Sequence, residues 1–140
     1  MRKVSILIGI CLLAGVALTL WAQAVEEQLS PVMKQVAPTA ASLRMNLTAK
    51  DASAAANDAQ KLGELFTQAQ GIFKAAKVGD AAKVAKGNAA EAQETLAAIK
   101  AGDWDAATAK AGAIQKTCKG CHDVHREEVS PGSKTYKFKP

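Results

Sequence analysis

The stretch LAAIKAGDWDAATAKAGAIQ, residues 96–115, decides the fold of this chain. Gly102 is the residue type that ends helices, and Asp103 directly after it is a type that caps helix N-termini. One helix therefore ends and another begins within two residues, and so short a joint places them antiparallel. Residues 78–80, Val-Gly-Asp, form a second joint of the same kind. These joints predict antiparallel neighbouring helices.

The composition supports a small all-α protein. The 140 residues, 14.6 kDa, allow one domain. Hydrophobic residues make up 49% of the chain but aromatic residues only 4%, and alanine alone occurs 30 times. A β-sandwich or barrel would need more β-branched and aromatic residues, and a disordered chain would lack the regular apolar spacing. We therefore expect an antiparallel four-helix bundle.

Four helices are predicted from apolar residues that recur every three or four positions. The expected ranges are about 31–49, 51–78, 80–102 and 104–130. Ser30 is the expected N-cap of the first helix with Pro31 at its first position, and Pro38 is expected to kink it or delay its start. Asp80 is the expected cap of the third helix, and residues 130–132, Ser-Pro-Gly, should end the fourth.

The predicted core is thin. Outside the first 24 residues, 26 of the 51 hydrophobic residues are alanine. Short side chains bury little area, and small domains are marginally stable. Such a chain either packs its helices very closely or encloses something large and apolar.

The N-terminal segment is typical of an export signal. Met1-Arg2-Lys3 is a positive n-region, residues 4–20 are almost wholly apolar, and Ala22-Gln23-Ala24 matches a signal-peptidase site. We predict a signal peptide over 1–24 and a four-helix domain over 25–140. The alternative is an uncleaved membrane anchor, because the apolar run approaches spanning length. Either interpretation predicts export, to the periplasm.

The remaining charge is mild, and it points to no nucleic-acid partner. Removal of residues 1–24 lowers the net charge from +5 to +3. No run of Lys and Arg with interleaved aromatics is typical of a nucleic-acid surface. The basic tail, residues 133–139, is expected to be a solvated chain end.

The chemistry of the chain is concentrated in Cys118-Lys119-Gly120-Cys121-His122, the C-x-x-C-H pattern of covalent c-type haem attachment. Cysteines at i and i+3 of a helix can reach the two vinyl groups of haem. His122, four residues after Cys118, lies on the same face and can bind the iron. Haem c is attached outside the cytoplasm, so the predicted export supports the motif independently.

Other uses of the two cysteines fit less well. A thioredoxin-like dithiol needs its first cysteine at a helix N-terminus, whereas this pair lies late in a helix. A zinc site could recruit both cysteines and His125, but the chain has only two histidines. A disulfide between i and i+3 of a helix would have strained geometry.

The chain resembles the class II c-type cytochromes, the family of cytochrome c-prime and cytochrome c-556. The resemblance covers the architecture of the mature chain, and in residues it is specific over 118–126. It implies thioether bonds from Cys118 and Cys121, axial ligation by His122, and Arg126 beside the haem, one helical turn on. His125 stands where the family commonly has an aromatic residue.

The resemblance places the second axial residue on the first helix, where Met33 lies on the inward stripe. A methionine thioether is a soft ligand that raises the reduction potential of haem iron. We therefore expect an electron-transfer protein with iron bound by His122 and Met33. In the alternative, Met33 only fills space, and a five-coordinate iron binds NO or CO. Met45 lies off the stripe and His125 faces the side of His122, so neither is expected to be the second ligand.

A third interpretation is a helical interaction module without haem. No arrangement of residues suggests an enzyme. The expected partners are redox proteins, with no membrane insertion after signal cleavage. The resemblance also leaves a homodimer through the first two helices open.

Overall fold

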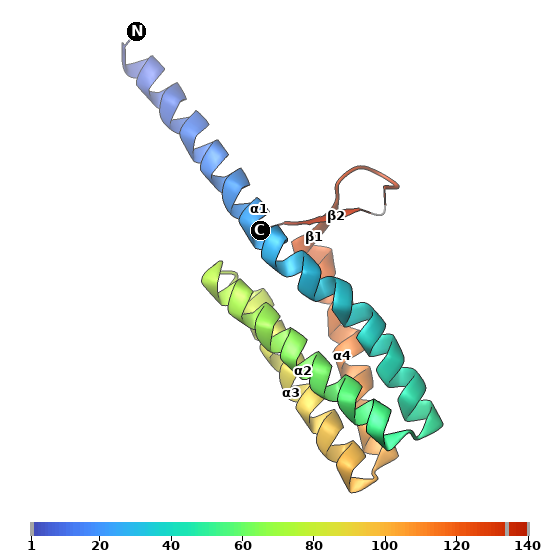
Figure 1. The fold of residues 1–140 in the computed structure, drawn as a ribbon. Helices are drawn as coiled ribbons and strands as arrows, with labels where there is room; N and C mark the ends of the chain where they lie inside the picture. Colours follow the sequence, from blue (N-terminus) through green and yellow to red (C-terminus); the bar gives the residue numbers. More distant parts are fainter. Residues whose placement is uncertain (1, 134, 140) are drawn as a thin grey trace.

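The computed structural model describes residues 2–133 and 135–139, with side chains described from Trp21 onward. Its elements are α1 (Arg2–Ala49), α2 (Ala52–Ala75), α3 (Gly79–Ala101), α4 (Trp104–His125), β1 (Arg126–Glu128) and β2 (Tyr136–Phe138). Four helices packed against one another confirm the all-α bundle (Figure 1).

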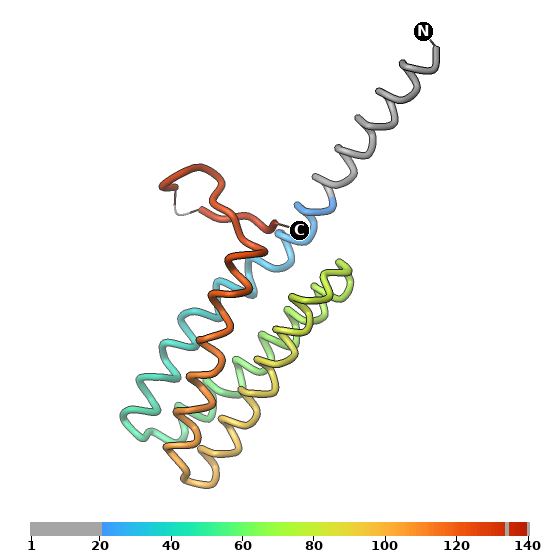
Figure 2. The backbone as a smooth tube through the Cα atoms, turned by 180° about the vertical axis from the view of Figure 1, so that it is seen from behind, coloured from blue at the N-terminus to red at the C-terminus, as the bar shows by residue number. Residues whose placement is uncertain are grey.

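Each helix packs against the next in the chain, and α1 also contacts α4 and β2. The turns α1–α2 and α3–α4 lie at one end of the bundle, which we call the closed end (Figures 1 and 2). The α2–α3 turn and the β1–β2 hairpin lie at the other end, which we call the hairpin end. Toward the hairpin end the α2–α3 pair diverges from the α1–α4 pair in both views.

The predicted apolar stripes form the core. Their fully or nearly buried members are Leu29, Val32, Val36, Leu43, Leu47, Ala55, Ala59, Leu62, Phe66, Ala69, Phe73, Ala92, Ile99, Ala107 and Ile114. Small residues bring helices close: a Cβ added to Gly63 on α2 would lie 3.8 Å from the Cβ of Ala92 on α3. The chain thus compensates in part for its small core side chains, because alanine and glycine let the helices pack closely.

Two aspartates cap helices at the closed end, and the sequence predicts one of them, Asp103. Asp51 and Asp103 each accept a hydrogen bond from the backbone N–H three residues later, at 3.0 and 2.9 Å. Gly102 ends α3 in the left-handed conformation, with φ of 75°. This conformation favours glycine, so the Gly-Asp joint is confirmed here.

At the other Gly-Asp joint a short turn joins α2 and α3 as predicted, but the predicted cap is wrong. Helix α3 begins at Gly79, and its N-cap Val78 makes no side-chain capping bond. Asp80 is therefore inside the first turn, where its carboxylate accepts a 2.9 Å bond from the N–H of Ala81. The second carboxylate oxygen is left for a contact with α4 described below.

Helix α1 begins earlier than predicted and continues through Ser30, Pro31 and Pro38. Buried Val25 and Leu29 extend the apolar stripe upstream of Pro31, and this packing favours a continuous helix over a cap at Ser30. The signal-peptide prediction concerns residues 1–24, most of which lie outside the described side chains, so it stays a prediction. No helix in the described part of the chain is long and apolar enough to cross a membrane.

The end of the chain differs most from the prediction. Helix α4 ends at His125, not near residue 130, because Arg126 adopts an extended conformation with φ of −134° and ψ of 130°. Strand β1 pairs antiparallel with β2, with Arg126 opposite Phe138. The described residues of the tail are exposed as expected, except Phe138, which is only 5% exposed and anchors the tail in the core.

Candidate functional site

A pocket of about 810 Å³ lies at the hairpin end. All four helices and the tail line it, and its size falls within the roughly 300–1,000 Å³ of small-molecule sites. Its apolar wall residues are Leu29, Val36, Ala37, Ala40, Phe66, Phe73, Ala81, Val84, Ala85 and Phe138. The bundle thus combines close packing at one end with an apolar pocket at the other.

Cys118, Cys121 and His122 all line this pocket from the last turns of α4. Both cysteines are free and half-buried. Burial raises the pKa of each thiol, and for Cys121 the nearby Asp80 carboxylate adds to the increase in pKa. At neutral pH both groups therefore keep their protons as uncharged thiols.

His122 is half-buried beside the two cysteines. Burial lowers the pKa of its imidazole, and the positive charge of Arg126 lowers it further. The ring is therefore neutral at neutral pH, which is the form that binds a metal.

Met33 faces the same pocket from α1 and is half-buried against the core. Met45, which the sequence places off the stripe, is 64% exposed and does not line the pocket. The pocket therefore brings Met33 together with Cys118, Cys121 and His122. These three residues lie 85 or more positions after Met33 in the chain.

Arg126 also lines the pocket, but it is the first residue of β1 and does not continue α4. Its guanidinium lies 4.0 Å from the centre of the Tyr136 ring. Lys34 on α1 and Lys137 on β2 line the pocket as well. Three cations from three elements thus face a pocket whose walls are otherwise mostly apolar.

Asn88 contributes a buried polar group at helical spacing between the apolar residues Val84 and Ala92. It is 3% exposed and lines the pocket from α3. Its side-chain oxygen accepts a 2.6 Å bond from the hydroxyl of Thr117, the residue before Cys118. The sequence signal for this bond was a polar residue at an otherwise apolar position, because a buried amide normally has a hydrogen-bond partner.

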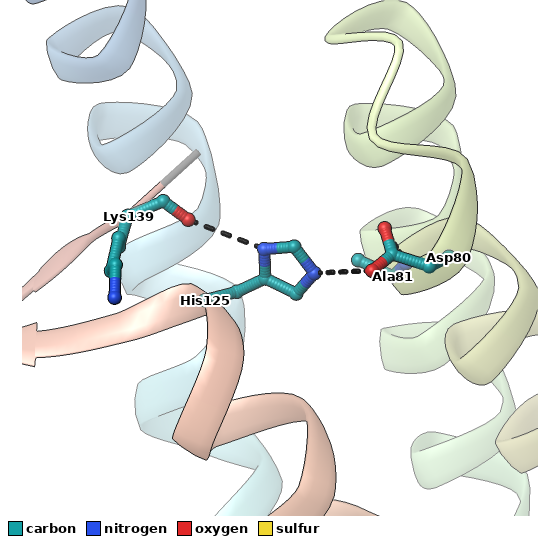
Figure 3. A network of polar contacts seen from close by, with 4 residues as sticks. All are labelled: Asp80, Ala81, His125 and Lys139. Atoms are coloured by element: carbon teal, nitrogen blue, oxygen red, sulfur yellow. Dashed lines mark hydrogen bonds and ion pairs between the residues drawn. The ribbon is translucent and has the colours of Figure 1, made fainter.

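His125 connects three parts of the molecule at the hairpin end (Figure 3). Its Nε2 lies 3.0 Å from a carboxylate oxygen of Asp80, and its Nδ1 lies 3.2 Å from the carbonyl oxygen of Lys139. Its ring stacks on that of Phe138, with centroids 6.1 Å apart. The sequence did not predict this contact, although the alternation Tyr136-Lys137-Phe138 was a strand signal.

The residues present fit a covalently attached haem. Two thiols and a neutral imidazole share one wall, a methionine thioether lies on another, and apolar side chains line the space between them. Within the described residues, no three His, Cys, Asp or Glu side chains form a group that could hold a bare metal ion.

No known protein family, curated protein or solved structure matches this chain.

Proposed function

We propose that this protein is an exported monohaem c-type cytochrome that transfers electrons. The observation that supports this most strongly is that one pocket gathers every residue of the C-x-x-C-H motif that would touch haem, together with Met33. The motif alone is five residues long. Its placement beside a methionine on an apolar pocket adds a second, independent argument.

Each residue has a defined part in this proposal. Cys118 and Cys121 would hold the haem through thioether bonds, and His122 and Met33 would bind its iron. The bound haem would supply the capacity to take up and release one electron. With two residues of the chain on the iron, the site would favour electron transfer over gas binding.

The surroundings of the site support the same use. Phe66, Phe73 and Leu29 present apolar walls, which exclude water from a bound group. Arg126 and Lys34 are cations at the same pocket, and haem carries two carboxylates that need such partners. A neutral His122 needs no deprotonation before it binds iron.

The location and partners remain part of the proposal. A signal peptide over 1–24 would take the chain to the periplasm, where haem c is attached, and redox proteins there would exchange electrons with it. The proposal includes no role as an enzyme.

The test is a visible absorption spectrum of the exported protein, with and without carbon monoxide. We expect haem bands that carbon monoxide does not move, because Met33 occupies the sixth position. The Met33→Ala protein should bind carbon monoxide and have a lower reduction potential. Met45→Ala is the matched control, because Met45 is exposed away from the pocket.

Three results would overturn all or part of this proposal. Absence of haem bands would exclude a cytochrome and favour a helical interaction module. Bands that shift with carbon monoxide in the parent would favour the five-coordinate gas-binding protein. Unchanged spectra in Met33→Ala would show that Met33 only packs beside the haem.

A further inference from the structure

The C-terminal tail, residues 135–139, is a wall of the pocket as well as a chain end. Residues 135–138 all line the pocket. Phe138 is buried, with its ring 6.3 Å from that of Phe73 on α2 and 6.1 Å from that of His125 on α4. The tail therefore forms one wall of the pocket at the hairpin end.

Polar contacts from several elements hold this tail in place. The hairpin contributes three residue pairs of a two-stranded sheet, and an isolated hairpin is marginally stable in water. The N–H of Phe138 donates to the Glu26 carboxylate at 2.6 Å, and the N–H of Lys139 donates to the carbonyl of His125 at 2.9 Å. The other polar contacts include the exposed Lys137–Glu127 ion pair within the hairpin and the side chain of His125.

His125 is placed to hold the tail from two directions. Its side chain is only 10% exposed, although Asp80 opposite is 69% exposed. Both ring nitrogens face acceptor atoms, the carboxylate of Asp80 on α3 and the carbonyl of Lys139 in the tail. The ring thus links the diverging α3 to the tail, three residues after His122 on α4 (Figure 3).

We propose that His125 is a positioning residue that pins the tail, residues 135–139, across the hairpin end and so sets how far a bound haem is shielded from water. The pinning of the tail stands on the contacts above. Its effect on haem rests on the proposed function.

The first experiment measures amide hydrogen exchange at Phe138 and Lys139, and its readout needs no haem. His125→Phe keeps an aromatic ring against Phe138 but removes both ring nitrogens, and Asp80→Ala removes one of the two acceptors that these nitrogens face. We expect the amides of Phe138 and Lys139 to exchange roughly tenfold faster in both variants. The local opening that exposes them would no longer have to break the contacts of His125. Glu127→Ala is the control, since it breaks only the exposed ion pair with Lys137 in the same hairpin.

The second experiment measures the reduction potential of the haem protein. We expect a lower potential in His125→Phe, because water reaching the site stabilises the more highly charged oxidised iron. His125→Gln can still donate one of the two bonds and should give an intermediate potential.

The two experiments separate the two proposals. Amide exchange rates within about twofold of the parent in both His125→Phe and Asp80→Ala would overturn the proposal that His125 pins the tail. Faster exchange with an unchanged potential would show that His125 is structural only and would overturn its positioning role. A parent protein without haem would overturn the proposed function, and the exchange result would then decide whether the tail is pinned.

Discussion

The two ends of the bundle are built by different means. At the closed end, short turns at Asp51 and Asp103 hold the helices together, and Leu43 is 1% exposed. At the hairpin end, the helix pairs diverge (Figure 1), and the tail forms one wall of a pocket of about 810 Å³. Every residue with a proposed role in chemistry lies at the hairpin end.

This difference separates stability from function within one small domain. Interiors are normally packed to high density, so a pocket of this size forgoes contacts that would stabilise the fold. The closely packed end, where alanines such as Ala55 and Ala107 are fully buried, has to stabilise the bundle. The pocket end can then hold residues chosen for their chemistry. The predictions below test this division.

The largest effect is expected from the cysteines. Replacing both Cys118 and Cys121 with alanine should abolish covalent haem attachment, because no other cysteine lies in residues 25–140. The measurement is haem staining of the exported protein after denaturing electrophoresis. Met45→Ala should keep full staining. Haem retained covalently in the double variant would contradict the proposed attachment.

The next largest effect compares matched leucines at the two ends. In the chain lacking both cysteines, Leu43→Ala should lower the free energy of unfolding by about 2–5 kcal/mol, because it leaves a cavity in packed core. Leu29→Ala should cost roughly 1–2 kcal/mol, because Leu29 already borders the pocket. Urea unfolding measures both. Equal costs would show that the two ends are packed equally well.

The closed end could be predicted from the sequence because local signals decide it. Gly102 and Asp103 are neighbours, and each acts within one turn of helix, so pattern and structure agree. The spacing of apolar residues likewise predicts which face of each helix is buried, whichever helix packs against that face. Met33, Cys118, Cys121 and His122 were placed on inward faces by the same argument.

The hairpin end could be predicted only in part because contacts distant in sequence decide it. The bond between His125 and Asp80 joins residues 45 positions apart, and the bond between Phe138 and Glu26 joins residues 112 apart. Neither leaves a local pattern. Asp80 has the residue type of a cap but bonds instead to α4, and the start of α1 was misplaced because packing of Val25 and Leu29 overrides the signal at Ser30.

A smaller effect is expected from the caps of the closed end. Asp103→Ala should lower the free energy of unfolding by about 1 kcal/mol, because the N–H of Ala106 loses its acceptor. Asp105→Ala is the control: it removes an acidic residue from the same turn without removing the cap, so a loss of only about 0.3 kcal/mol is expected. Thermal or urea unfolding distinguishes the two. Equal losses would assign the effect to charge and not to capping.

The smallest effect concerns the pH dependence of the hairpin end. The hydrogen bond from His125 lowers the pKa of the Asp80 carboxyl below its ordinary value of 3.8, and the N–H of Ala81 lowers it further. A carboxyl with a lowered pKa in the folded state stabilises that state above its unfolded pKa, and the contribution disappears as pH falls through the folded pKa. The parent should therefore be slightly more stable than Asp80→Ala at pH 7.

That difference should shrink as the pH falls below 3.8 and disappear below the lowered pKa of the folded state, where the Asp80 carboxyl takes up its proton and the ionised acceptor for His125 is lost. Urea unfolding midpoints of the parent and Asp80→Ala, compared between pH 7 and pH 2.5, provide the measurement. Glu127→Ala is a useful comparison, because Lys137 lowers the pKa of the Glu127 carboxyl in the same hairpin but away from His125. Only the loss of Asp80 should also speed amide exchange at Phe138 and Lys139. A difference that stays constant down to pH 2.5 would mean that the charge of the Asp80 carboxylate does not stabilise the fold, and the hairpin end would then be held without its charged contact.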